Sequence, residues 1–354
     1  MLAFILVLCL TAGVSAQSQC TLITAKKPCV ANDCEWCASI HRCAIPGTCP
    51  GGVRTATKSQ RPVVLKTQRP VVLMHGLMAT APAMSHAQGW IEADYPGIYV
   101  KNVEIGKGKS KFDSLLIDIN KQVSDFAKQV KNDTKLTHGF NLIGHSQGAL
   151  IARAYIHRFN DPPVYNFISW AGPHAGVYGV PWFNALCPDV ACPWLVEAMD
   201  DLVRPKGIAT IAESLVSFAA YWRSPVNYTA YVSNNVFLAD INNEGPTKKA
   251  SYKQNFVSLN HVALLHAAKD LIVVPSKSEW FSFYDTVKGT DGIVVPFSEQ
   301  PMYKEDWIGL RTLDEAKKIT RWSVPCAHQD VPRADCKSFA YDNVTKALLN
   351  NFLP

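Results

Sequence analysis

One serine stands between two glycines in the stretch GHSQG, residues 144 to 148. Apolar residues lead up to this stretch, and the run ALIARAYIHRF, which is typical of a helix, follows it. Where a strand turns sharply into a helix, a G-x-S-x-G pattern holds a serine on a strained bend, because strand and helix approach closely only if the flanking residues lack side chains. The pattern by itself also fits a tight turn without chemistry. Its position between strand and helix favours a nucleophile at Ser146.

Two backbone N–H groups near this serine could stabilise an oxyanion. The N–H of Gln147 begins the expected helix, where the partial positive charge of the helix end favours an anion. The residues His75, Gly76 and Leu77 close an earlier apolar run. In turns of this type the second donor comes from the loop after an early strand. We therefore expect the N–H groups of Leu77 and Gln147 to form an oxyanion hole.

A nucleophilic serine needs a histidine base and a carboxylate that fixes the tautomer of that histidine. In hydrolases with this serine turn, the acid and then the histidine follow the serine along the chain. His328 is the only histidine after His266, so it is the expected base. Asp270 in AAKDLIVVP and Asp291 in GTDGIVVP could each supply the acid. Asp270 directly follows an expected strand and is favoured, with Asp291 as the alternative.

Other residues near these positions have simpler interpretations. His145 adjoins the serine, but a strand-like backbone turns its side chain the other way, which predicts a core or loop histidine. His174, in AGPHAG, follows a strand end, and a packed loop position is favoured over substrate contact. Cys326 and Cys336 bracket His328, and a disulfide between them would close a short loop around the expected base.

The elements that must position these residues alternate along residues 69–354. Short β-branched runs alternate with helical patterns, which indicates a mostly parallel sheet with helices on both faces. The segment 177–235 breaks this rhythm with aromatic residues and prolines, and we expect it to be an insertion over the carboxyl edge of the sheet. It also holds Cys187 and Cys192, which we expect to be disulfide-bonded. The expected strands are 71–76, 140–146, 164–172 and 262–268, and the expected helices are 113–130 and 149–159.

The first residues predict export. Residues 1–16, MLAFILVLCLTAGVSA, carry no charged side chain and end in small residues, which is typical of a secretory signal peptide cleaved after Ala16. An N-terminal membrane anchor is the alternative, but the apolar run is shorter than the about 20 residues that a span needs. We therefore expect the chain to enter the secretory pathway.

Cysteine usage agrees with an oxidising compartment. Removal of the signal peptide leaves ten cysteines, and six of them lie within residues 17–52. We interpret this segment as a disulfide-rich module, joined by a basic linker at 53–68 that carries the first of two RPVVL repeats. The first repeat is either linker or an extra edge strand. A zinc site is the alternative for CEWCASIHRC, since Cys34 and Cys37 have ligand spacing with His41 nearby. Export favours disulfides, so no metal is expected.

Charge and sequons add modest constraints. The net charge is +6, and no basic motif interleaved with aromatic residues suggests nucleic acid as a partner. The clustered lysines at 101–111 indicate a solvated face, with weak contact to an anionic membrane surface as the functional alternative. The sequons at Asn132, Asn227 and Asn343 are expected glycosylation sites and therefore predict surface positions.

Several stretches together resemble one family. The segments VLMHGL, PGIYVKNVEIG, GHSQGALIARA, VFLADIN and KDLIVVPSKSEWFSFYD are similar to those of the palmitoyl-protein thioesterases, lysosomal α/β-hydrolases that remove fatty acyl groups from cysteine thioesters. The similarity covers about residues 69 to 354. It implies an α/β-hydrolase fold with an acyl groove partly built by the insertion. It also implies Ser146 as nucleophile, Asp270 rather than Asp291 as acid and His328 as base, and it places Leu77 and Gln147 at the oxyanion positions.

Two features depart from the family. The cysteine-rich module is foreign to it, and its DCEWCASIHRC resembles plexin-semaphorin-integrin modules, which suggests a binding or spacer role. The loop after Leu77 reads MAT and lacks the polar residues expected there.

The resemblance implies a lysosomal or secreted thioesterase that needs no cofactor. Its expected substrates are S-acylated proteins, S-acylated peptides and acyl-CoA. A lipase or carboxylesterase for oxygen esters is the alternative within the same class. A binding protein on a silent hydrolase scaffold is the alternative from another class.

Overall fold

The computed structural model describes residues 35–37, 42–44, 67–106, 110–179 and 217–353. The chain divides into two compact units, Met1–Leu65 and Lys66–Pro354. In the first unit, β1 (Glu35–Cys37) pairs antiparallel with β2 (Arg42–Ala44). The expected signal peptide, the first RPVVL copy, most of the cysteine-rich module and linker, and both Cys187 and Cys192 lie outside the described residues. The proposed domain boundaries therefore stay a prediction.

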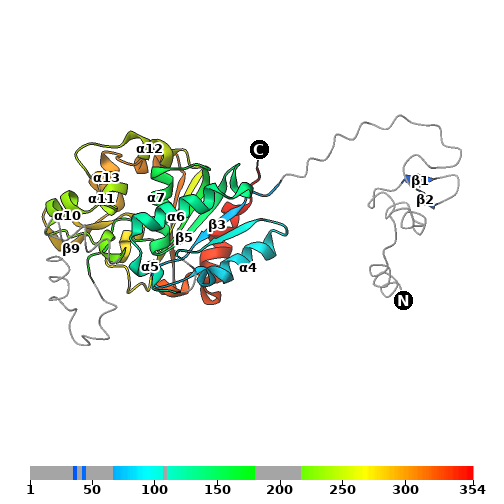
Figure 1. Cartoon of the computed structure of the whole chain (residues 1–354), viewed down its shortest axis with the longest axis horizontal. Coiled ribbons are helices and arrows are strands. Elements are labelled where there is room, and N and C mark those ends of the chain that lie inside the picture. Colours follow the sequence, from blue (N-terminus) through cyan, green and yellow to red (C-terminus); the bar gives the residue numbers. More distant parts are fainter. Residues whose placement is uncertain (1–34, 38–41, 45–66, 107–109, 180–216, 354) are drawn as a thin grey trace. The chain divides into compact units, whose positions relative to one another are not determined.

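A six-stranded parallel sheet forms the centre of the second unit (Figure 1). Its strand order is β10-β7-β6-β5-β3-β4, and every neighbouring pair is parallel. The strands are β3 (Val71–Met74), β4 (Val100–Val103), β5 (Phe140–His145), β6 (Val164–Trp170), β7 (His261–Ala267) and β10 (Ile319–Val324). The expected strands at β3, β5, β6 and β7 are confirmed. The outer strands β4 and β10 were not expected.

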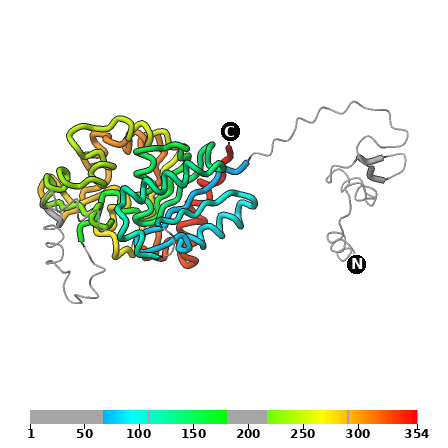
Figure 2. The backbone as a smooth tube through the Cα atoms, in the orientation of Figure 1, coloured from blue at the N-terminus to red at the C-terminus, as the bar shows by residue number. Residues whose placement is uncertain are grey.

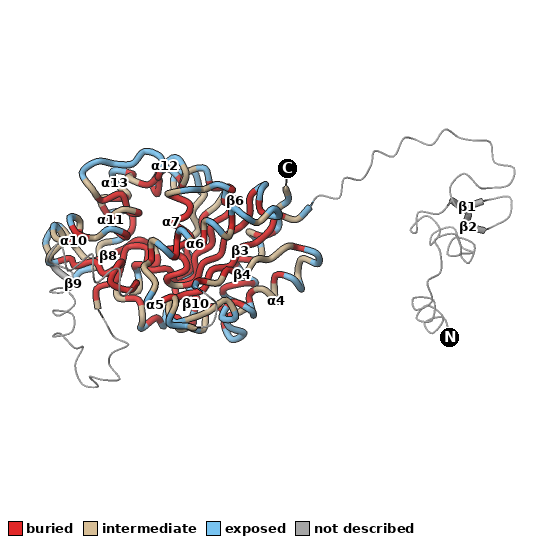
Figure 3. The backbone as a smooth tube through the Cα atoms, in the orientation of Figure 1, coloured by how far each residue is buried: buried red, intermediate tan, exposed pale blue. Residues whose placement is uncertain are grey.

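Alternation along the strands separates two cores. Val72 and Met74 point to one face of the sheet, and Val71 and Leu73 to the other, because successive side chains of a strand face opposite ways. The first face packs against α6 (Ile119–Lys131), α7 (Gln147–Arg158) and α12 (Ala250–Val257). The second packs against α4 (Ser85–Asp94) and the π-helical segment η9 (Lys337–Thr345). Figure 3 shows the strands buried between these layers. This arrangement confirms the expected α/β-hydrolase fold.

The expected helix 113–130 is two helices. α5 (Asp113–Leu116) stops where Ile117 adopts an extended backbone, and α6 begins at Ile119. The carboxylate of Asp118 accepts the N–H of Lys121 and caps α6, so the break is a normal helix start. Leu116 is exposed as a result, although its spacing fits a buried helix face.

The remaining elements connect this scaffold. β8 (Phe283–Asp285) and β9 (Thr290–Val295) form a separate antiparallel pair. The other short helical elements are η1 (Ala81–Met84), η2 (Thr134–Leu136), η4 (Ser217–Tyr221), α10 (Tyr228–Asn234), α11 (Leu238–Ile241), η5 (Ser276–Trp280), η6 (Phe297–Glu299), α13 (Pro301–Lys304), α14 (Leu310–Glu315), η7 (His328–Asp330), η8 (Ala334–Cys336) and α15 (Lys346–Leu349).

The end of the chain returns to the start of the second unit. The N–H of Arg69 donates to the carbonyl of Asn351 at 3.1 Å, and the N–H of Leu353 donates to the carbonyl of Thr67 at 2.9 Å. Figure 2 shows this as the red end of the tube beside its first blue segment. No helix in the described part of the chain combines the length and the apolar character that crossing a bilayer requires.

Candidate active site

Ser146 is the single residue between β5 and α7. Its φ of 55° and ψ of −127° lie in a region that a residue with a side chain rarely adopts. The N–H of Ser146 donates to the carbonyl of Trp170 at 2.9 Å, which ties the bend to the end of β6. The backbone is thus held in a strained conformation at the carboxyl edge of the sheet, as a nucleophile elbow requires.

Both flanking glycines are required by close packing. A Cβ atom on Gly144 would lie 2.6 Å from the Cα of Ala149, inside the first turn of α7. A Cβ on Gly148 would lie 2.3 Å from the carbonyl oxygen of His75 and 2.5 Å from that of Met74. The two glycines therefore let α7 pack directly against β5 and against the end of β3.

Three expected residues meet at this bend. The Nε2 of His328 lies 2.8 Å from the Oγ of Ser146, and its Nδ1 lies 2.5 Å from the Oδ2 of Asp270. Asp270 follows β7, and His328 follows β10, so the carboxyl ends of parallel strands bring all three together. Asp291, the alternative acid, lies in β9 of the separate antiparallel pair.

The surroundings of Asp270 favour its ionised form. Its Oδ1 accepts the N–H groups of Ile272 at 2.6 Å and Val273 at 2.9 Å. Burial works against the charge, but the hydrogen bond and the charge of His328 outweigh it and hold the pKa of Asp270 below its ordinary value. An ionised acid facing Nδ1 selects the tautomer in which Nε2 of His328 can accept a proton.

The loop that carries His328 is fixed from two sides. Cys326 and Cys336 form a disulfide across it, as expected from the sequence. His145 is buried, and its Nε2 lies 2.9 Å from the carbonyl oxygen of His328. Burial, followed by the neighbouring His328, lowers the pKa of His145 to about 3, so this ring is neutral and its Nε2–H donates to the carbonyl. The sequence predicted a core or loop histidine here but not this contact.

The residues that carry the expected oxyanion donors adjoin the serine turn, Leu77 after Gly76 and Gln147 directly after Ser146. Gly76 packs so closely that a Cβ there would lie 2.8 Å from the Cβ of Ser146, which brings the loop of Leu77 against the serine. Within the part of the chain described by the structure, the N–H groups of Leu77 and Gln147 donate to no other group. Glu104 anchors the same loop, because its Oε2 accepts the N–H of Ala81 at 2.7 Å.

The side chain of Gln147 anchors the start of α7. It is buried, and its Nε2 donates to the carbonyl of Ser114 at 2.8 Å and to Oε1 of Gln122 at 3.2 Å. The hydroxyl of Ser217 donates to Oε1 of Gln147 at 2.9 Å. Ser217 belongs to the expected insertion, so this segment reaches the serine turn.

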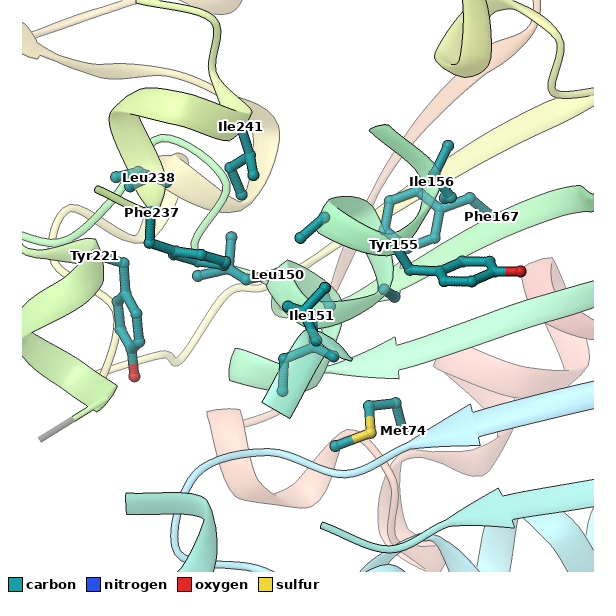
Figure 4. Close-up of a cluster of buried hydrophobic side chains, with 14 of the residues drawn as sticks. Met74, Leu150, Ile151, Tyr155, Ile156, Phe167, Tyr221, Phe237, Leu238 and Ile241 are labelled. Carbon is teal, nitrogen blue, oxygen red and sulfur yellow. The ribbon is translucent and has the colours of Figure 1, made fainter. Parts of the chain in front are cut away.

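Aromatic residues of the insertion pack against one another. Tyr178 lies against Trp222 with ring centroids 5.3 Å apart, and Phe218 lies 5.3 Å from Tyr221. Figure 4 shows Tyr221 near Leu150 of α7, within the same buried cluster. The described part of the insertion thus adds buried aromatic side chains to the core that contains α7.

The other expected site residues have different surroundings. His174 is buried and stacks on Phe281 with centroids 4.7 Å apart, so the packed loop position is the observed one. Asn132 and Asn343 are exposed, and Asn227 is partly buried. Their glycosylation stays a prediction.

One acidic residue at the site was not expected. Glu279 in η5 is buried beside Asp270 and His328, and ligand-type atoms of these three residues lie within 4.8 Å of one another. Among the residues that the structure describes, these three form the group of acidic and histidine side chains close enough together to hold a metal ion. Two of its members already bond to each other and one of them to Ser146, so the arrangement suits proton transfer.

Comparison with known proteins identifies the family. The profile of the palmitoyl protein thioesterase family matches residues 70–328. Palmitoyl-protein thioesterase 3 of Dictyostelium discoideum is 42% identical over 81% of this chain and 94% of its own. Palmitoyl-protein thioesterase 1 of Caenorhabditis elegans is 33% identical over 75% and 88%, and the lysosomal thioesterase PPT2 homolog of Drosophila melanogaster is 31% identical over 73% and 85%. The chain therefore belongs to the palmitoyl protein thioesterase family and is a hydrolase.

Proposed function

We propose that this enzyme hydrolyses long-chain fatty acyl thioesters of cysteine, with Ser146 as nucleophile, His328 as general base and Asp270 as the acid that orients the base. The unbroken row of hydrogen bonds from Ser146 Oγ through both nitrogens of His328 to Asp270 Oδ2 carries this proposal. A serine hydroxyl is a weak nucleophile near neutral pH until a base removes its proton. In this row Nε2 takes the proton, and the carboxylate stabilises the imidazolium that forms.

Acylation then follows from the positions of these groups. Ser146 Oγ attacks the thioester carbonyl carbon, and the carbonyl oxygen becomes an oxyanion that receives the N–H groups of Leu77 and Gln147. The C–S bond breaks, and the proton on His328 passes to the departing sulfur, directly or through solvent after the sulfur has left as a thiolate, so His328 is neutral again. Because a cysteine thiol has a pKa of about 8.5, protonation of this leaving group matters less than for an alcohol.

Deacylation repeats the proton transfer with water. His328 removes a proton from a water molecule, which attacks the acyl carbon on Ser146, and the second tetrahedral intermediate uses the same N–H groups. The fatty acid leaves, and the proton on His328 returns to Ser146 Oγ. Serine and histidine are restored, so no cofactor takes part.

Binding of the acyl chain is assigned to a groove partly built by the aromatic-rich insertion, residues 177–235. Each buried methylene contributes about 0.8 kcal/mol, so a long chain gains affinity as far as the groove extends. In the described part, Phe218, Tyr221 and Trp222 are buried and packed together, so they are suited to support the wall of such a groove from behind.

Substrates and location follow as parts of the same proposal. S-acylated proteins and peptides are the proposed substrates, as the names of the relatives suggest, and acyl-CoA is a further one. Several relatives are named lysosomal thioesterases, which supports delivery to the lysosome after a signal peptide at residues 1–16. The lysines clustered at 101–111 are proposed to add weak contact with a membrane surface.

A direct comparison of ester types tests this function. Palmitoyl thioesters and the matching oxygen esters are supplied at equal chain length, and kcat/KM is measured for wild type and Ser146→Ala. A preference for the thioester that disappears in the variant supports the proposal. A strong preference for the oxygen ester makes the protein an esterase or lipase. Folded protein whose Ser146 resists a fluorophosphonate probe is instead a binding protein.

A further inference from the structure

Glu279 places a second carboxyl group directly behind Asp270. Its side chain is 0% exposed. Its Oε2 accepts the N–H of Ala267 at 2.8 Å, and the carbonyl of Ala267 accepts the N–H of Asp270 at 3.0 Å. Both carboxyl groups are therefore fixed to the same end of β7. One oxygen of each lies within 4.8 Å of the other and of a nitrogen of His328.

The two carboxyl groups are stabilised unequally. Asp270 accepts hydrogen bonds from His328 and from two backbone N–H groups. Glu279 accepts one, and its Oε1 has no partner of ordinary hydrogen-bond geometry among the residues that the structure describes. Two carboxylates this close cannot both stay ionised at low cost, so a proton belongs on the less stabilised one. Burial first, and then the neighbouring Asp270, raise the pKa of Glu279 well above its ordinary value.

The other titratable groups around Asp270 and Glu279 do not change which of these two carboxyl groups holds the proton. Lys277 lies on the same short helix, with its ammonium over the ring of Trp280. Its charge favours ionisation of Glu279, but burial and the neighbouring Asp270 oppose that ionisation more strongly. His266 on β7 packs against Trp280, and burial lowers its pKa to about 4. His145 on β5 is neutral for the same reason.

We propose that Glu279 is a protonated positioning residue that donates a hydrogen bond from Oε1 to Asp270. This inference rests on the proposed function, in which Asp270 orients His328. A donor behind Asp270 spreads its negative charge, so the carboxylate attracts a proton on His328 less strongly. Ser146 then keeps a neutral base at lower pH. This hydrogen bond from Glu279 to Asp270 suits an enzyme that works in an acidic compartment.

Substitution of Glu279 by glutamine and by leucine tests this role. Glutamine reproduces the protonated acid, with an oxygen for Ala267 and an N–H donor for Asp270, whereas leucine has a similar size and no donor. The rate of labelling of Ser146 by a fluorophosphonate is measured against pH on the full chain. We expect Glu279→Gln to match wild type, and Glu279→Leu to move the acidic midpoint up by about half a pH unit or more. Equal midpoints in all three proteins, or a glutamine variant that follows leucine, would overturn the inference.

The melting temperatures of wild type and Glu279→Gln, measured against pH, give a second test. This test does not need the leucine variant to fold. The folded wild type keeps a proton that the unfolded chain releases above about pH 4.3, so wild type loses stability as the pH rises. Glutamine has no such proton. We expect equal melting temperatures near that pH and a growing advantage of the glutamine variant above it. A constant difference would show that Glu279 is ionised.

These readouts separate the role of Glu279 from the substrate. Labelling reports on Ser146 and His328 whichever ester the enzyme cleaves. Wild type that is labelled but does not cleave palmitoyl thioesters contradicts the proposed function and leaves the comparison at Glu279 valid. Thioester turnover with three equal midpoints contradicts only the role of Glu279.

Discussion

Replacement of Gly148 by alanine should separate the two proposed oxyanion donors. The added methyl group would lie 2.3 Å from the carbonyl oxygen of His75, where ordinary contact begins at 3.4 Å, so the backbone must move by about 1 Å. The atoms it meets are backbone, and no side-chain rotation relieves the contact. The end of β3, which leads to the N–H of Leu77, is therefore pushed away from the start of α7, which carries the N–H of Gln147.

The expected losses of stability and of activity are measured separately. Overpacking of this kind costs about 1–3 kcal/mol of stability, which urea unfolding reports. A displacement of about 1 Å at reacting groups lowers the rate about 100-fold, so kcat/KM for a palmitoyl thioester should fall by that factor after correction for folded protein.

Gly89→Ala is the matched control. Gly89 is exposed on α4, and a Cβ there meets nothing within 4 Å. We expect unchanged kcat/KM and a gain of about 0.5–1 kcal/mol, because alanine favours the helix. Wild-type activity in Gly148→Ala would refute the idea that close packing of α7 against β3 sets the oxyanion geometry.

Three further outcomes follow from the described contacts. Asp270→Asn presents an amide to His328 and should lower kcat by about 10⁴-fold through the wrong tautomer, whereas Asp291→Asn should change it little; the reverse pattern would show that the acid is misassigned. Arg223→Met leaves the buried carboxylate of Glu244 without the guanidinium that lies 2.8 Å from it. The free energy of unfolding in urea should fall by about 3–5 kcal/mol, and a fall below about 1 kcal/mol would contradict this. Asp270 should stabilise the folded chain at pH values above about 4, its ordinary pKa in the unfolded chain, and this stabilisation should be lost as the pH falls below about 4 through the lowered pKa of the folded state. Asp270→Asn should remove that part of the pH dependence of melting.

The serine turn could be predicted from the sequence because its causes are local. Gly144 and Gly148 must lack side chains wherever a strand and a helix meet this closely, and the residues on either side show which element each is. His328 was predicted by its position in the chain alone. These predictions needed no knowledge of distant contacts.

The acid and its neighbour depend on the tertiary fold. Asp270 and Asp291 have nearly the same sequence around them, and the residues alone left both open. They differ in position, since Asp270 follows β7 of the central sheet, whereas Asp291 lies within β9, which is outside that sheet. Glu279 lies in the stretch KDLIVVPSKSEWFSFYD that resembles the family, but nothing in that stretch gave it a role, because a charged residue in a short polar run normally lies at the surface.

The differences between the predicted and the observed helices and strands also have physical reasons. The helix at 113–130 has a continuous apolar spacing, but Asp118 can cap a new helix, and that capping contact ended the first one. Strand β10 was missed because Arg321, Trp322 and Ser323 are exposed at the edge of the sheet, so the strand has no buried alternation. Local patterns were sufficient for the inner strands, in which nearly every residue is buried.

Direct detection of the acyl-enzyme tests the central claim most clearly. The chain is mixed with a palmitoyl thioester, quenched in acid within the first turnover, digested and mapped by mass spectrometry. The account predicts a palmitoyl group on Ser146 and none in Ser146→Ala, which should also lose turnover. A palmitoyl group on another residue, or full turnover in Ser146→Ala, would contradict it.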